Sequence, residues 1–392
     1  LPGTLTPGTY QVVVGKAKIV EEPAFYRIEV VLREEATLAP QPERRPYEDA
    51  PALASGARWY AGDFHVHSRE SGDAAPSLDA IATFAAGRGL DFVALSDHNT
   101  VSQLEWIADA QARHPTLLFV PSVEYTTYDG HANGIGATRW VDHRIGQPGV
   151  DIAAAAADFE AQGAFFSINH PNLNLGELCI GCAWQQPLDP GQIRGIEIIT
   201  GGWDPVGKLF FEQTLAQWEE NLDQGYPVVP IGGSDDHRAG QDDGATASAI
   251  GSPTTLVWAE ELSVPALLEG LRAGRTVVKL QGPDDPMVEL WPTNTGLEAT
   301  VTGGIGAELH WFIRGSEVEV VAITQDPQKV LLTRQGERGR AELWVEGQPR
   351  VLTNYLPIPR PIEELNKDCG CTKNSAAFLL FPLFLLRRRY QS

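Results

Sequence analysis

The stretch "SLDAIATFAAGRGLDFVALSD" occupies residues 77–97 and combines a helical pattern with a strand pattern. Ser77 is a good N-cap for the helical part, which Gly87 and Gly89 bring to an end. The run that follows, residues 91–97, is short and apolar and ends in polar residues, as buried strands often do. The stretch therefore predicts a helix that leads directly into a strand.

The same alternation continues along the chain. Further apolar runs with polar ends lie at residues 117–125, 164–169, 194–200 and 226–235. Helical stretches lie between several of these runs, at residues 101–114, 151–163 and 208–225. Strand–helix alternation on this scale predicts an α/β fold, built on a parallel sheet or a barrel, over residues 58–280.

The flanking regions have strand patterns without helices. Residues 9–20 and 24–32 alternate apolar and polar side chains, and a Pro-, Ala- and charge-containing linker follows near residues 39–57. Alternating runs between turn residues return after residue 280 and fit a small sandwich. The predicted order is a β-rich N-terminal domain with its linker (1–57), the α/β domain (58–280), a β-sandwich-like domain (281–360) and a terminal segment (361–392).

Composition restricts the class of partner. The 392 residues carry 30 basic and 51 acidic side chains, a net charge of −21. Such a chain repels the phosphates of nucleic acids, so we exclude DNA and RNA and expect a small-molecule substrate. Four cysteines are too few for a disulfide scaffold.

Potential metal ligands follow the predicted strands. His65 and His67 are two residues apart in a strand pattern, so both side chains point the same way and can share an ion. Asp235 and His237 have the same spacing. Groups of this kind gather where the C-terminal ends of barrel strands meet. The candidate ligands are His65, His67, Asp73, His98, Glu124, His131, His170, Asp235 and His237.

This set is larger than one tetrahedral ion needs. Mixed nitrogen and oxygen donors favour Zn, Mn or Fe over Ca or Mg, and the number of donors suits two to three divalent ions. Such ions can convert water into hydroxide at neutral pH. The sequence thus predicts a metal-dependent hydrolase that uses a metal-activated hydroxide at a multinuclear site.

Several motifs, in order, resemble the PHP (polymerase and histidinol phosphatase) superfamily of metal-dependent phosphoesterases. They are "DFHVHS" (63–68), "SGDA" (71–74), "FVALSDHNT" (92–100), "SVE" (122–124), "NHP" (169–171) and "GGSDDH" (232–237). Two others, "GHANGIG" (130–136) and "GIEIITGGW" (195–203), are most similar to the carbaryl-hydrolase-like branch. The resemblance covers roughly residues 58–280.

The resemblance implies a distorted seven-stranded β/α barrel with a trinuclear site made by the nine residues above. One position departs from the family pattern. Many members have Ser-Asp-Gly after the His-x-His, where this chain has Ser71-Gly72-Asp73, so Glu70 is the next candidate for that ligand.

Three further residues are candidates for other roles at the site. In similar phosphoesterases a residue at the position of Arg69 contacts substrate phosphate, and a guanidinium suits phosphate or carboxylate; Arg238 is a second candidate. Asp97 is a candidate catalytic residue that would orient a metal-bound imidazole, with capping of the following turn as the alternative.

The cysteines fall in two close pairs. We expect Cys179 and Cys182 to form a short-loop disulfide in an exported protein, with metal binding as the alternative. The second pair, Cys369 and Cys371, precedes an apolar run of eleven residues (376–386) and three arginines. That run is too short to span a membrane, which takes about 20 residues.

This terminal segment resembles the C-terminal sorting signals of myxobacteria, although a packed terminal strand is an alternative. The resemblance implies processing and lipid attachment at Cys369 or Cys371 and a place at the outer membrane or cell surface.

Three functions are compatible with these features. The first is hydrolysis of phosphoesters by the predicted metal site. The second is hydrolysis of carbamates or amides at the same site, since a hydroxide held by metals also attacks a carbonyl carbon. The third is a surface binding module in which the metal only stabilises the barrel.

Overall fold

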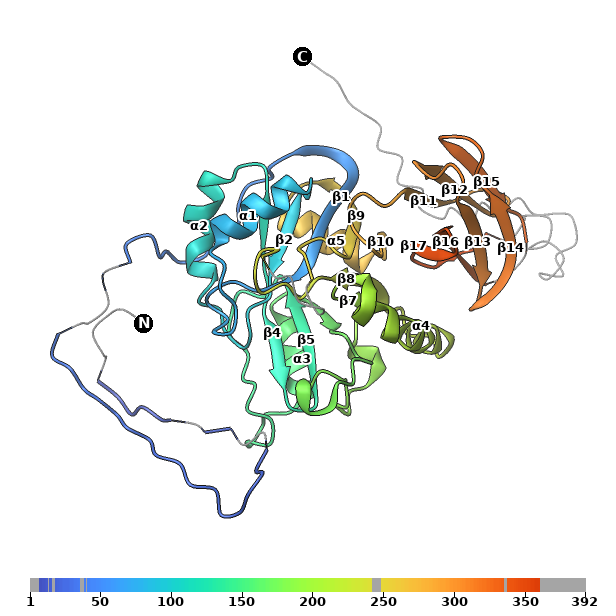
Figure 1. Cartoon of the computed structure of the whole chain (residues 1–392). Helices are drawn as coiled ribbons and strands as arrows, with labels where there is room; N and C mark the ends of the chain where they lie inside the picture. The colour runs from blue at the N-terminus through green and yellow to red at the C-terminus, as the bar shows by residue number, and fades with distance from the viewer. Residues whose placement is uncertain are drawn as a thin grey trace, which may run out of the picture.

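The computed structural model describes residues 7–12, 14–15, 18–35, 39, 41–241, 248–334 and 337–359 (Figure 1). Within these residues five α-helices form: α1 (Leu78–Gly87), α2 (Leu104–Arg113), α3 (Ile152–Ala161), α4 (Lys208–Asp223) and α5 (Val264–Arg272). The predicted N-cap is confirmed, because the Ser77 hydroxyl accepts a hydrogen bond from Ala80 N at 3.2 Å. Capping by Asp151 and Ser263 starts α3 and α5 in the same way.

Two sheets build the central α/β body. The first contains β1 (Ser55–Val66), β2 (Phe92–Leu95), β3 (Leu118–Pro121), β9 (Thr254–Glu261) and β10 (Thr276–Lys279), in the order β3-β2-β1-β9-β10. The second contains β4 (Glu124–Thr127), β5 (Gly130–Ile135), β6 (Phe165–Ile168), β7 (Gly195–Thr200) and β8 (Val229–Gly233), in sequence order. β1–β3 are parallel to one another, as are β6–β8, whereas β4, β5 and β6 are antiparallel.

The mixed α/β class is confirmed, but the strands do not form one continuous seven-stranded ladder in the described part of the chain. The parallel ladder ends at β3, where the chain passes through two residues into β4 of the other sheet. Short bridges join the sheets: Val66 pairs with Asp236, and His98 pairs with Glu124. These bridges bring the C-terminal ends of β1, β2 and β8 against the start of β4.

The C-terminal region is β-rich, as predicted. A sheet of β11 (Met287–Pro292), β12 (Leu297–Thr302) and β15 (Gln328–Leu332) packs on β13 (Glu308–Ile313), β14 (Ser316–Ala322), β16 (Arg338–Val345) and β17 (Gln348–Thr353), with β18 (Leu356–Pro357) beside β16. Buried Trp311 and Leu309 belong to the core between these layers. β17 also pairs with β10, so this region continues the first sheet of the α/β body.

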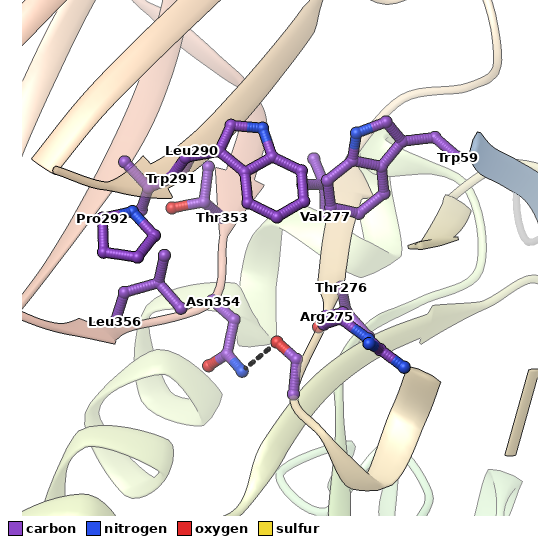
Figure 2. A pocket seen from close by; sticks show the side chains of 11 residues that line it. Trp59, Arg275, Thr276, Val277, Leu290, Trp291, Pro292, Thr353, Asn354 and Leu356 are labelled. Carbon is purple, nitrogen blue, oxygen red and sulfur yellow. Dashed lines mark hydrogen bonds between the residues drawn. The ribbon is translucent and has the colours of Figure 1, made fainter. Parts of the chain in front are cut away.

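The seam between the two regions holds a cavity of about 100 Å³ (Figure 2). Trp59 of β1 and Trp291 of β11 line it, with ring centroids 6.0 Å apart. The indole nitrogen of Trp59 donates to Glu289 at 3.1 Å. Aromatic packing across β1 and β11 therefore fixes the C-terminal region to the body.

The N-terminal strand prediction is not met in the described residues. No strand occurs in them before Ser55, and apolar side chains such as Val20 and Phe25 are 83% and 90% exposed. Alternation alone does not make a strand, because an alternating segment needs an apolar layer on which to pack.

Some elements of the fold were not predicted from the sequence. β9 and α5 were not predicted, and the single run predicted at 117–125 is divided between β3 and β4. None of the helices in the described ranges has both the length and the apolar character needed to cross a bilayer. The predicted sorting signal, with Cys369 and Cys371, lies outside the described residues, so surface attachment stays a prediction.

Candidate metal centre

The end of β1 places two imidazoles in the interior of the body. The side chains of His65 and His67 are fully buried. Nε2 of His65 lies 3.3 Å from Oε1 of Glu124 and 3.2 Å from Oδ1 of Asp235. Nε2 of His67 lies 3.6 Å from the other Glu124 oxygen and 3.1 Å from the same Asp235 oxygen. The two histidines therefore share two carboxylates, as their spacing predicted.

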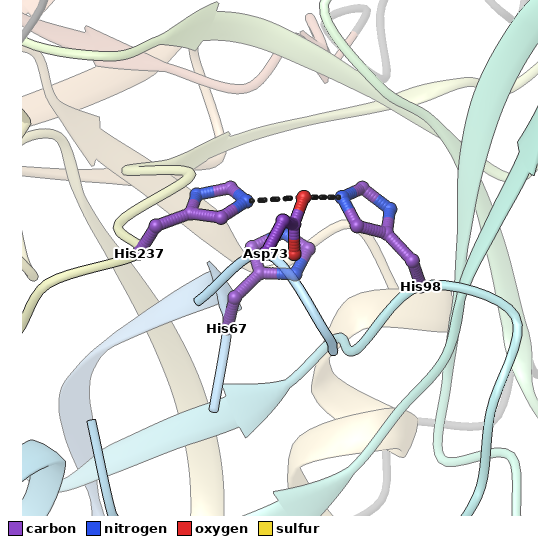
Figure 3. Close-up of side chains that lie close together, drawn as sticks. All are labelled: His67, Asp73, His98 and His237. Atoms are coloured by element: carbon purple, nitrogen blue, oxygen red, sulfur yellow. Dashed lines mark ion pairs between the residues drawn. The ribbon is translucent and has the colours of Figure 1, made fainter. Parts of the chain in front are cut away.

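Asp73 lies between two more imidazoles (Figure 3). Its Oδ2 is 3.1 Å from Nε2 of His98 and 3.4 Å from Nε2 of His237. The carboxylate of the alternative ligand, Glu70, pairs with the guanidinium of Arg44 and belongs to none of the candidate ligand groups in the described residues. The geometry therefore favours Asp73 at the position where the sequence left two candidates.

Glu124 lies at the centre of the remaining contacts. Its Oε1 is 3.2 Å from Nδ1 of His131 and 3.5 Å from Nε2 of His170. The same oxygen accepts a hydrogen bond from Asn169 at 2.9 Å, which fixes the carboxylate. Glu124 begins β4 and His131 lies on β5, so one hairpin supplies both.

All nine predicted ligands belong to groups whose donor atoms lie close enough to hold an ion. Four overlapping groups occur in the described residues: His67, Asp73, His98 and His237; His65, His67, Glu124 and Asp235; His65, His170 and Glu197; and Glu124, His131 and His170. The overlap means that neighbouring ions would share ligands. This His, Glu and Asp cluster could hold divalent metal.

Five of the imidazoles have the arrangement typical of metal-binding histidines. In each, one ring nitrogen is bonded to a neighbouring group and the other faces the cluster, although Nδ1 of His98 also lies 2.6 Å from Oε2 of Glu124 within the cluster. The Nδ1 contacts are His65 to Glu197 at 3.0 Å, His67 to Ser71 Oγ at 3.1 Å, His98 to Thr126 Oγ1 at 2.6 Å, His170 to the Cys182 carbonyl at 3.0 Å and His237 to the Asp235 carbonyl at 2.8 Å. A carbonyl only accepts, so His170 and His237 carry a proton on Nδ1, which leaves Nε2 as the nitrogen that can bind an ion.

Several buried polar atoms of the cluster make no hydrogen bond. Nε2 of His65 and of His67 lies near carboxylate oxygens without hydrogen-bond geometry, and Nε2 of His131 and Oε2 of Glu124 also have no hydrogen-bond partner. A buried polar atom left unpaired costs about 1–3 kcal/mol. Coordination of an ion would satisfy these atoms, so the residues present fit the predicted metal site.

The pKa values agree with a cluster of alternating charge. Burial lowers the pKa of His67 to about 4, which makes this imidazole neutral at pH 7. Burial also lowers the pKa of His98, but Glu124 and Asp73 outweigh this effect and raise it to about 11. Burial would raise the pKa of Glu124, but neighbouring imidazoles hold it well below its usual range. Ions that bind here would displace protons.

Backbone strain is concentrated at the same strand ends. His170 and Asp235 have φ values of 29° and 56°, in the region that favours glycine. Asn99, next to His98, has a φ of 51°. Strained non-glycine residues persist where the surroundings fix them, often at functional sites.

The carboxylate of Asp97 bonds the chain beside His67, and its predicted role in orienting an imidazole stays a prediction. Asp97 is fully buried, and its two carboxylate oxygens accept hydrogen bonds from the amide and the hydroxyl of Ser68, each at 2.6 Å. Burial raises the pKa of Asp97 to about 7. Asp97 therefore positions the chain that follows His67.

The two candidate substrate contacts lie at the surface. The guanidinium carbon of Arg69 stands 4.6 Å from the ring centroid of Trp106 on α2, and its side chain is exposed. Arg238 is also exposed. In the structure the side chain of Arg69 packs on an aromatic ring of α2. Contact of Arg69 or Arg238 with a substrate stays a prediction.

The sequence reasoning missed Glu197. This residue lies on the otherwise apolar strand β7, is 2% exposed, and accepts from His170 N at 2.8 Å in addition to its contact with His65. A lone carboxylate within a fully apolar strand was the available signal, since a buried charge requires partners.

Comparison with solved structures gives distant likenesses at low sequence identity. No family model matches the chain, and no curated protein matches it. A Bacteroides vulgatus two-domain protein containing a predicted PHP-like metal-dependent phosphoesterase is 19% identical over 80% of this chain and 99% of its own, with a TM-score of 0.46.

Two other solved structures cover about half of this chain. A candidate metal-dependent phosphoesterase from Bifidobacterium adolescentis is 14% identical over 48% of this chain and 91% of its own, with a TM-score of 0.33. An amidohydrolase from Chromobacterium violaceum is 16% identical over 48% of this chain and 90% of its own, with a TM-score of 0.32. At these values the likeness assigns no role to any residue of this chain.

Proposed function

We propose that this protein is a metal-dependent hydrolase that acts on phosphoesters. One observation carries the proposal: buried imidazoles bonded outward through Nδ1 direct Nε2 onto carboxylates that they share. A scaffold that only needed metal for stability would require fewer ligands than these nine, so the binding-module alternative is weaker.

The residues of the site have two kinds of role: some would hold the ions, and others hold those ligands in place. The cluster groups would hold two to three ions, with Glu124, His65, His67 and His170 placed where neighbouring groups overlap. Bound divalent ions lower the pKa of water and withdraw charge from the ester oxygens. Asp97 holds the chain that follows His67 through Ser68, and Glu197 holds both His65 and His170.

A second candidate function is hydrolysis of carbamates or amides at the same site. The position of Arg69 favours it, because this exposed guanidinium stacks on Trp106 of α2. A neutral carbonyl substrate needs no guanidinium to balance phosphate charge.

The test compares the two substrate classes on one preparation. Protein loaded with Zn²⁺ or Mn²⁺, with its metal content measured, is assayed on aryl phosphate mono- and diesters and on aryl carbamates. We expect phosphoester hydrolysis that His65→Ala/His67→Ala abolishes without loss of the circular dichroism of the fold. Faster carbamate hydrolysis would select the second candidate, and failure on both classes by metal-loaded protein would refute a hydrolase of either kind.

A further inference from the structure

The chain between His170 and Gln186 leaves the metal cluster and returns to it. Cys179 and Cys182 form a disulfide within this segment, as predicted. The carbonyl of Cys182 is the group that His170 Nδ1 contacts at 3.0 Å, and both residues are buried. The disulfide-closed turn therefore supplies the acceptor that sets the tautomer of a candidate ligand.

The same segment also holds the hairpin of β4 and β5. Gln185 N donates to the Asp129 carbonyl at 2.7 Å, and Gln186 Nε2 donates to Thr127 Oγ1 at 2.8 Å. Gly181 lies so close to the Thr127 carbonyl that a Cβ on it would come within 2.2 Å. The turn between the two cysteines is thus packed directly on the hairpin.

Trp184 extends this contact to the hairpin turn. A Cβ at Gly130 would lie 2.6 Å from the Trp184 ring, so the indole rests on the backbone next to His131. The hairpin begins with Glu124. One segment thus contacts His170 directly, and it packs on the turn of the hairpin whose strands carry Glu124 and His131.

We propose that the Cys179–Cys182 disulfide is a positioning element of the metal centre: it holds the group Glu124, His131 and His170 in its ion-binding arrangement, and its reduction weakens divalent-ion binding there. The inference rests on the proposed metal centre and adds redox control of one part of it. The group His67, Asp73, His98 and His237 makes none of the contacts described above with this segment, so its affinity is expected to stay unchanged.

The disulfide is placed where a reductant can reach it. Cys182 is buried, but Cys179 is only partly buried and its neighbour Ile180 is 41% exposed. A phosphine reductant attacks one sulfur and breaks the S–S bond. Water then supplies the oxygen of the phosphine oxide and two protons, which leave two cysteine thiols.

The experiment measures zinc binding by the whole chain. Metal-free protein is dialysed against buffered Zn²⁺ and its zinc content is determined in four forms: oxidised, phosphine-reduced and freed of reductant without air, reoxidised, and Cys179→Ser/Cys182→Ser. Ile180→Ser is the matched control, since it changes the same turn and keeps the disulfide. The double serine variant also excludes zinc bound by the new thiols.

We expect the reduced protein and the double serine variant to lose about 10- to 100-fold in affinity at one class of sites, the range for removal of a ligand-orienting contact. Reoxidation and the Ile180→Ser control should both show the affinity of the oxidised protein. If the serine variant does not fold, the reduced and reoxidised forms of the unaltered chain decide the question.

Equal zinc binding by oxidised and reduced protein would overturn this inference and leave the proposed metal centre standing. An equal loss at every site would also overturn it, because it would show a general loss of structure. If the oxidised protein binds no zinc, both the proposed function and this inference fail.

Discussion

Two regions of the molecule place histidine beside carboxylates, and they differ in how the carboxylates are used. In the C-terminal sheet, His310 has Nδ1 2.8 Å from Glu317 and Nε2 3.9 Å from Glu308, and its ring stacks on Trp344. Among the described residues, Glu308 and Glu317 form ion pairs with no other histidine. In the body, His65 and His67 share Glu124 with further imidazoles.

The comparison shows which feature indicates a metal site. An unbonded buried nitrogen occurs in both regions, since Nε2 of His310 also lacks a hydrogen bond. Only in the body do several such atoms converge on the same carboxylates. Convergence on shared carboxylates, rather than one unpaired atom, separates the metal cluster from an ordinary ion pair.

The largest expected effect is loss of metal from the body alone. His65→Ala/His67→Ala removes ligands from three of the four groups, so we expect most of the bound ions to be lost. His310→Ala removes a histidine with two carboxylates but should leave metal content unchanged. Elemental analysis of both variants beside the unaltered chain measures this, and an equal loss in both would remove the distinction between the regions.

A buried arginine at the seam should affect stability without affecting metal. Arg340 is 1% exposed and pairs with Glu342 and, at 2.9 Å, with Glu219 of α4. Arg340→Ala leaves these carboxylates without their partner, so we expect a loss of about 3–5 kcal/mol in the free energy of unfolding.

Urea unfolding measures this loss. Arg334→Ala, which removes an exposed arginine 3.9 Å from Glu319, is the control and should cost under about 1 kcal/mol. A drop in metal content in folded Arg340→Ala would show that the seam and the cluster are coupled.

A substitution of Glu197 tests whether its contacts with His65 and His170 support metal binding. Glu197→Gln keeps the shape but weakens the contact that holds the His65 proton on Nδ1, so we expect about 10- to 100-fold lower metal affinity. Glu160→Gln, at an exposed carboxylate paired with Arg194, should leave the affinity unchanged. Metal titration of the two variants would contradict the assignment if both gave the affinity of the unaltered protein.

The smallest expected effect is a pH dependence at the seam. Burial raises the pKa of Tyr355 to about 12. Its folded pKa lies above its unfolded value of about 10, so the stabilisation is complete below pH 10 and is lost as the pH rises towards 12. We expect the unaltered chain to lose about 1–3 kcal/mol more than Tyr355→Phe over this interval.

Urea unfolding at pH 9, 10 and 11 follows this difference. Parallel curves for the two chains would mean that the phenol of Tyr355 titrates no differently in the folded state.

The sequence predicted the parts of the molecule that depend on local pattern. Alternation of apolar runs and helical stretches located β2, β6, β7, β8 and α1–α4, and the i, i+2 spacing located His65 and His67. What it missed depends on partners distant in the chain. Glu197 acts through residues 132 and 27 positions away, and Asp97 acts through Ser68. The N-terminal alternation misled for the same reason, since no partner layer covers it in the described residues.

The pairing of β10 with β17 affects how this protein can be divided. The body and the C-terminal region read as separate domains in the sequence, with a boundary at residue 281, but residues 277–279 of β10 pair across that boundary with residues 351–353 of β17. A chain that ended at 280 would leave β10 as an open edge, with unpaired N–H and C=O groups that can template aggregation. The C-terminal region therefore protects the edge of the sheet whose strands β1 and β2 lead into the candidate metal centre.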